Sequence, residues 1–154
     1  MFKYLYVLIF ILADFFSKRL AVQFLKDNTA IEILPGILRL SYVENTGAAF
    51  GIMQNMRWFF VVLTVIIILV FMYIQKTKLN KTRFFDTGVL FVISGAIGNF
   101  IDRLCLGYVV DFIDFYLIDF PVFNIADIFV CIGTGLICIH YLFFEKEEKE
   151  IENG

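Results

Sequence analysis

Histidine, cysteine and proline are scarce in this sequence, and each shortage excludes a class of chemistry. The 154 residues include one histidine, His140, together with three cysteines and two prolines. A single histidine cannot supply a zinc site built from several histidines, and no serine–histidine triad can be assembled around it. The cysteines form no CxxC pair, so we interpret all three as structural, apolar fillers: Cys105, Cys131 and Cys138.

Charged residues are also scarce. They make up 18% of the chain, against about 25% in a typical soluble domain, whereas hydrophobic residues make up 60%. A membrane span takes about 20 apolar residues, so the chain has room for about four spans and for no separate soluble domain. The 13 basic and 15 acidic residues are nearly balanced and leave no broad basic surface, which excludes nucleic acid as an expected partner.

Four stretches have the apolar character of membrane spans. The clearest runs from Trp58 to Ile74 without a charge and has basic residues on both sides. The first stretch is interrupted by charges but has no small-x-small cleavage pattern, so we interpret it as an uncleaved helix. We expect one membrane-embedded domain over 1–154, with spans at roughly 4–22, 58–75, 86–102 and 123–144, outer segments at 23–57 and 103–122, and an acidic tail at 145–154.

Two of the segments between the spans have the pattern of β-strands. Ile31 to Val43 contains β-branched residues around a Pro35-Gly36 turn signal, and 107–115 is similarly strand-like. The predicted fold is an α-helical integral membrane protein with four transmembrane helices and a small outward-facing β platform. The length and glycines of 31–51 also suggest that this segment closes over a bound substrate: Gly36, Gly47 and Gly51.

Basic residues predict the orientation in the membrane. The link at 76–83 carries four Lys or Arg residues in eight positions and no acid. By the positive-inside rule this link lies in the cytoplasm, and both termini then lie there too. The two longer connections therefore face outward.

Ionisable and amide side chains inside spans are costly and usually serve a role. Asp14 and Lys18 are four residues apart, so they share a helix face as a structural ion pair or as part of a binding site. Asn99 and Arg103 repeat this spacing, and the arginine either binds a substrate or extends to the membrane interface. We expect Asp102 to lie on a different face, where it caps or solvates the helix end.

Two further acids, Asp111 and Asp127, lie at the outer boundary. Asn124 and Asp127 are three residues apart at the start of the fourth span, and the connection from Asp111 is short enough to bring both carboxylates together. Two adjacent carboxylates share one proton and can act as base and acid on a peptide bond, as in an aspartic protease. A proton relay and a structural pair are the alternatives that the spacing leaves open.

Five strings in this sequence resemble those of the bacterial lipoprotein signal peptidases, known as signal peptidase II. Their order and approximate spacing match over about Leu12 to Cys131: DFFSK at 14–18, NTGAAFG at 45–51, GAIGNFIDR at 95–103, VDF at 110–112 and FNIAD at 123–127. Each string alone is weak evidence, whereas five in register are specific.

The resemblance implies an aspartic endopeptidase of the bacterial cytoplasmic (inner) membrane, with its active site at the outer face. Such enzymes remove the signal peptide from prolipoproteins and cut before a cysteine that carries a diacylglyceryl group. Carried over by position, Asp111 and Asp127 are the expected catalytic pair. The expected substrate-binding or supporting residues are Asp14, Lys18, Asn45, Gly47, Asn99, Arg103 and Asn124.

The resemblance also limits the expected partners. These are the prolipoprotein substrate and membrane lipid; no metal or other cofactor is expected, because two carboxylates and water suffice. A monomer is the favoured oligomeric state. Asp114 and Asp119 match no position in the five strings, so we expect them to be solvated loop acids. The alternatives from other classes are a small proton-coupled transporter or channel subunit, and a structural subunit that packs through its glycines.

Overall fold

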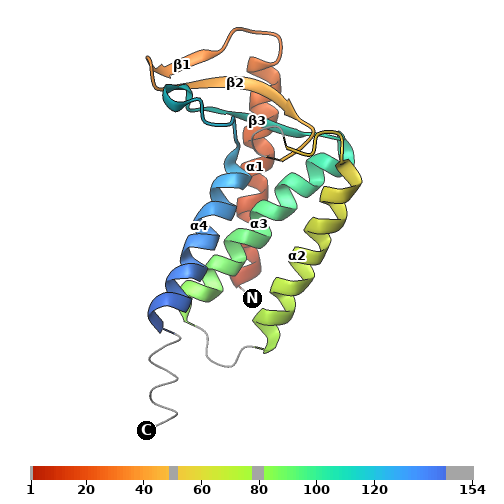
Figure 1. The fold of residues 1–154 in the computed structure, drawn as a ribbon, viewed down its shortest axis with the longest axis vertical. Coiled ribbons are helices and arrows are strands. Elements are labelled where there is room, and N and C mark those ends of the chain that lie inside the picture. Colours follow the sequence, from red (N-terminus) through yellow and green to blue (C-terminus); the bar gives the residue numbers. More distant parts are fainter. Residues whose placement is uncertain (1, 49–51, 78–81, 145–154) are drawn as a thin grey trace.

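Four long helices carry a small β-sheet at one end (Figure 1). The computed structural model describes residues 2–48, 52–77 and 82–144. The helices are α1 (Phe2–Leu25), α2 (Arg57–Thr77), α3 (Arg83–Cys105) and α4 (Ile125–Ile139), and one π-helical turn, η3 (His140–Phe144), extends α4. The expected acidic tail at 145–154 lies outside the described residues, as does part of the basic link.

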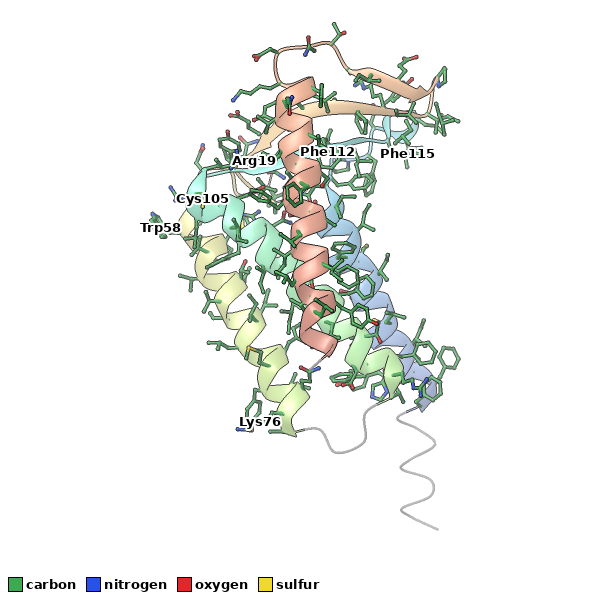
Figure 2. All side chains as sticks on the ribbon, turned by 180° about the vertical axis from the view of Figure 1, so that it is seen from behind. Arg19, Trp58, Lys76, Cys105, Phe112 and Phe115 are labelled. Atoms are coloured by element: carbon green, nitrogen blue, oxygen red, sulfur yellow. The ribbon has the colours of Figure 1, made fainter. Side chains whose placement is uncertain are left out.

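Three of the helical segments are long and apolar enough to cross a membrane: α2, α3 and residues 125–144. The 24-residue α1 has the necessary length but carries Asp14, Lys18 and Arg19 in its middle. Figure 2 shows Trp58 at the sheet end of α2 and Lys76 at the other end, with apolar side chains between them. The 21 residues of α2 span about 30 Å, which is the thickness of the hydrocarbon core of a bilayer.

The sheet has three antiparallel strands in the order β1-β2-β3: β1 (Ile31–Leu34), β2 (Leu38–Asn45) and β3 (Val109–Asp114). Gly36 has a φ of 77° in the turn between β1 and β2, a conformation that glycine adopts without strain. Residues on β3 are almost all buried, because α1 and β2 pack against them. The predicted four-helix protein with a small β platform is confirmed.

Small residues allow α3 and α4 to approach closely. A Cβ atom added at Gly88 would lie 2.7 Å from the carbonyl oxygen of Gly133, and one added at Gly133 would lie 2.6 Å from that of Gly88. Such close contact is typical of helix pairs in lipid. Gly135 has open space around it and takes no part in this packing.

Two predictions about side chains outside the centre of the molecule are wrong. All three cysteines are exposed on the protein surface rather than packed as fillers in its core. Asp114 is buried and accepts hydrogen bonds from Arg39 Nε at 2.6 Å and from Ser41 Oγ at 3.3 Å. The pairing of β2 with β3 sets Arg39 opposite Asp114, so Asp114 is part of strand β3 and not of a solvated loop. Asp119 is exposed, as expected.

Candidate active site

A cavity of about 550 Å³ opens where the sheet meets the adjacent ends of α3 and α4. Six residues expected from the sequence to form the site line it: Asn45, Gly47, Asn99, Arg103, Asp111 and Asp127. The remaining walls are largely apolar and come from the segment before α4 and from one face of α4 itself. The cavity therefore brings the two predicted acids, from separate elements, to one place.

Asp111 lies on β3 and is buried. One of its carboxylate oxygens accepts a hydrogen bond from Asn124 Nδ2 at 2.6 Å, and the other accepts one from Asn45 Nδ2 at 2.9 Å. Burial, together with the charge of Asp127, raises the pKa of Asp111 from 3.8 to about 7. Near neutral pH this side chain therefore holds a proton about half of the time.

Asp127 lies in the first turn of α4, and its local sequence explains its position. Asn124 and Asp127 form a capping box: Asn124 Oδ1 accepts from the Asp127 backbone N–H, and Asp127 Oδ2 accepts from the Asn124 N–H, each at 3.1 Å. The other oxygen, Oδ1, accepts a hydrogen bond from Asn99 Nδ2 at 2.8 Å. Two N–H donors and the positive end of the helix dipole thus surround this carboxylate and hold it in place.

Asn124 connects the two acids. Its Nδ2 donates to Asp111 and also to Asn99 Oδ1 at 3.1 Å, while its Oδ1 is used by the helix cap. The side chain is fully buried, so every one of these bonds is formed away from water. The amide orientation is therefore fixed, and with it the relative position of the two carboxylates.

Lys18 lies behind the site and is buried, as are the two carboxylates that it contacts. Its Nζ is 2.8 Å from Asp14 Oδ2 and 3.1 Å from Asp102 Oδ2, and it donates to Asn99 Oδ1 at 2.9 Å. Because Lys18 and Asn124 both donate to the Asn99 oxygen, the Asn99 NH₂ group must face Asp127. The predicted Asp14–Lys18 pair exists, and Asp14 also accepts from the Ala126 N–H at 2.9 Å.

The expectation that Asp102 points away from this cluster is wrong. Asp102 is buried, pairs with Lys18 and accepts a hydrogen bond from the Val110 N–H at 3.1 Å. That bond attaches the end of α3 to the residue beside Asp111. The sequence did contain a sign of this contact. Asp102 is three residues from Asn99, a spacing that places two side chains on the same helix face.

Arg103 and Gly47 join the outer segment to the helices. Arg103 Nη2 donates to the Gly47 carbonyl oxygen at 2.9 Å, and its guanidinium lies 4.8 Å from the centre of the Phe60 ring. A Cβ atom at Gly47 would lie 2.5 Å from the Ile52 carbonyl oxygen, so only glycine fits this turn. Residues 49–51, including Gly51, lie outside the described residues, and closure of 31–51 over a substrate stays a prediction.

Comparisons with known proteins identify the family. The model of the family described as signal peptidase (SPase) II matches residues 6–143. This chain belongs to the signal peptidase II family. The resemblance in the sequence is thereby confirmed.

Curated members of the signal peptidase II family are similar over nearly the whole chain. A lipoprotein signal peptidase of Clostridioides difficile is 44% identical over 94% of this chain and 99% of its own length. One from Halalkalibacterium halodurans is 36% identical over the full length of both chains. Two solved structures of a bacterial membrane enzyme, determined by the in meso method, share the fold. Both are 34% identical, with TM-scores of 0.85 and 0.83, and cover 91% and 92% of this chain and 87% and 93% of theirs.

Proposed function

We propose that this signal peptidase II is an aspartic endopeptidase that removes the signal peptide from diacylglyceryl-modified bacterial prolipoproteins and cuts before the lipidated cysteine. Asp111 and Asp127 are the proposed catalytic pair. The observation that carries the proposal is that two acids from separate elements line one cavity, where burial and the charge of Asp127 raise the pKa of Asp111.

The raised pKa of Asp111 assigns the shared proton to this acid. In the proposed reaction the Asp127 carboxylate takes a proton from a water molecule as that water attacks the scissile carbonyl carbon. Asp111 gives its proton to the carbonyl oxygen, so the tetrahedral intermediate forms without a free oxyanion. Collapse of the intermediate breaks the C–N bond as Asp127 gives its proton to the leaving nitrogen and Asp111 takes back a proton from a hydroxyl of the intermediate, which restores both acids.

The supporting residues have distinct proposed roles. Asn99 and Asn124 hold the pair in position, and Lys18 with its two carboxylates fixes Asn99 from behind. Arg103 has further N–H donors beyond the one used by Gly47 and lies at the cavity wall, so we assign it to the substrate backbone. Asn45 and Gly47 shape the wall on the side of the sheet.

The proposed location is the bacterial cytoplasmic membrane, with the cavity on the outer side and both termini in the cytoplasm. The support is the basic sequence at 76–83, since the end of α2 and the start of α3, which flank it, lie away from the sheet. Labelling with a membrane-impermeant maleimide tests this orientation. In intact spheroplasts Cys105, at the end of α3 near the sheet, should react. Lys76→Cys, in protein whose three native cysteines are replaced by serine, should react only after lysis; the reverse pattern would refute the orientation.

Cleavage of a purified diacylglyceryl-modified prolipoprotein tests the function. The wild type should cut before the lipidated cysteine, and Asp111→Asn and Asp127→Asn should each lose at least about 100-fold in rate, because each removes a proton-transfer group. Asp119→Asn is the matched control, since Asp119 is an exposed acid of the same outer segment and should keep the wild-type rate. Near-normal turnover by either variant of the pair would refute the catalytic assignment. A silent wild type would refute the enzyme itself, and a proton-flux assay in liposomes would then test the transporter alternative.

A further inference from the structure

A second cavity, of about 410 Å³, lies at the end of the helices opposite the sheet, where α1 and α3 begin (Figure 1). Helix α1 contributes Tyr6 and Phe10 to its walls, and α3 contributes five residues between Arg83 and Phe91. The volume falls in the range of about 300–1,000 Å³ that is usual for ligand sites. None of the lining residues belongs to the candidate active site, so the proposed reaction leaves this cavity without a role.

The walls change from polar to apolar along the length of the cavity. On α3 the lining positions are 83, 86, 87, 90 and 91, and these intervals place them on one helix face. From Arg83 this face passes through Thr87 to Phe91, about 12 Å further along the helix axis. Helix α1 repeats the order, because Tyr6 lies nearer to its start than Phe10. The Phe10 and Phe91 rings stack with their centroids 4.6 Å apart, so the inner part of the cavity has an aromatic wall.

Arg83 is an exposed cation at the mouth of this cavity. Within the described part of the chain its guanidinium takes part in no ion pair, although it has five N–H donors. The one acid among the lining residues, Asp86, is half-buried in the first turn of α3, where the helix dipole stabilises a carboxylate. The sequence before Arg83 is basic, with Lys76, Lys78 and Lys81 and no acid. The mouth therefore suits a ligand that has a phosphate and a net negative charge.

The surroundings of the cavity indicate which kind of molecule reaches it. Tyr6 and Thr87 are exposed, so the cavity opens on the outer surface of the helix pair, which faces lipid in a bilayer. A water-soluble anion would leave the apolar inner walls uncovered, and a peptide would place unpaired N–H and C=O groups against them. A phospholipid carries a phosphate, ester oxygens and an acyl chain. The cavity presents a cation, two hydroxyl groups and apolar walls in the same order.

We propose that this cavity binds one anionic phospholipid, with its phosphate on Arg83 and an acyl chain against the stacked rings of Phe10 and Phe91. In the proposed orientation this end of the helices lies at the cytoplasmic face, so the lipid comes from the inner leaflet. The inference goes beyond the proposed function, because the cavity takes no part in the peptidase reaction.

Lipid binding to the purified full-length protein tests the site. The probes are dioleoyl phosphatidylglycerol, which is anionic, and dioleoyl phosphatidylcholine, which has the same acyl chains and no net charge. Native mass spectrometry from detergent counts the lipids bound to each chain, with the acidic residues at 145–154 present in every measurement. The wild type should bind one phosphatidylglycerol about fivefold more tightly than phosphatidylcholine, the preference expected from one additional charge attraction. Equal affinity for the two lipids would overturn the anionic assignment.

Removal of the cation tests the place of the phosphate. Arg83→Gln should weaken phosphatidylglycerol binding about tenfold, because it removes the charged donor of the phosphate. Lys76→Gln is the matched control, since it removes one positive charge at the same end of the helices from an exposed residue that does not line the cavity. This control should change the affinity by less than about twofold. Equal losses in the two variants would mean that surface charge alone attracts the lipid, and the site would then be wrong.

A larger side chain at an exposed wall position tests the place of the acyl chain. Thr87→Trp occupies part of the cavity and should weaken the binding of both lipids about tenfold, the loss expected when contact with about two methylenes is blocked. Thr134→Trp, at an exposed threonine of α4 outside the cavity, should bind both lipids like the wild type. Unchanged lipid binding by Thr87→Trp would overturn the proposal.

The cleavage assay separates a lipid from the other candidate occupant, the signal peptide of the substrate. Thr87→Trp should cut a prolipoprotein with the wild-type KM, because this cavity and the two acids lie at opposite ends of the helices. A raised KM with unchanged lipid binding would assign the cavity to the signal peptide instead. The mass measurement needs no cleavage, so lipid binding by a protein that cuts nothing would sustain this inference while the proposed function fails.

Discussion

Replacement of Asp111 by asparagine should make the protein more stable relative to the wild type as the pH rises. Burial and the charge of Asp127 raise the pKa of Asp111 to about 7 in the folded protein, against an ordinary value of 3.8. Between about pH 4 and pH 7 the unfolded chain has lost this proton and the folded protein keeps it. The wild-type free energy of unfolding therefore falls through this window and levels off above about pH 7.

The size of the effect follows from the two pKa values. At about 1.4 kcal/mol per pH unit, the full gap between 3.8 and 7 corresponds to about 4 kcal/mol. Asparagine does not titrate, so its own contribution does not change with pH. Its NH₂ group must face the N–H donor of Asn45 or Asn124, and the lost hydrogen bond lowers stability by the same amount at every pH. The difference between the two pH values isolates the effect of titration: the variant should gain about 2 kcal/mol in stability on the wild type between pH 5 and pH 7.

The assay is the difference in Tm between variant and wild type in detergent at pH 5, 6, 7 and 8, followed by the fluorescence of Trp58, the one tryptophan. The expected gain corresponds to roughly 5–10 °C for a chain of this size. Asp119→Asn, which changes an exposed acid, should track the wild type at each pH. A difference in Tm that is the same at pH 5 and pH 8 would mean that Asp111 is ionised in the folded protein throughout. The assignment of the catalytic proton would then be wrong.

Three further predictions concern the surroundings of the pair. Lys18→Met leaves two buried carboxylates without their cation and should cost about 3–5 kcal/mol in a denaturation experiment. Lys26→Met, at an exposed pair, should have a much smaller effect, and equal costs would contradict the burial argument. Gly133→Ala forces α3 and α4 apart and should lower stability by about 1–3 kcal/mol, while Gly135→Ala, with open space around it, should be neutral or stabilising by up to about 1 kcal/mol. Asn99→Ala removes a hydrogen bond to a carboxylate and should lower kcat by roughly 10- to 100-fold; a change confined to KM would assign Asn99 to substrate binding instead.

The local features of this fold could be predicted from the sequence, because each depends on nearby residues. The Pro35-Gly36 turn with its flanking β-branched residues does form a hairpin, and the long apolar runs do form helices. The i, i+4 spacing of Asp14 and Lys18 does give an ion pair. The periodicity of apolar residues that predicts a helix or a strand can be read within a window of about ten residues.

The errors concern contacts between distant segments. The burial of Asp114 depends on the register that pairs it with Arg39, 75 residues earlier, and no local pattern specifies that register. Asp102 was assigned to a helix end, yet it meets Lys18 and Val110 across three elements. Both acids looked solvated because a carboxylate near a loop usually is, and only the tertiary structure supplies the cations and N–H groups that allow its burial.

The capping box at the start of α4 couples folding to catalytic competence. The same Asn124 and Asp127 side chains that close the first turn of this helix also form part of the proposed catalytic centre. Fraying of that turn would break the capping bonds of Asp127 and Asn124 at once, and Asp111 would keep only its hydrogen bond from Asn45. Formation of the first turn of α4 therefore places both side chains in a single step. Amide hydrogen exchange at Asp127 would then report the fraction of competent enzyme directly.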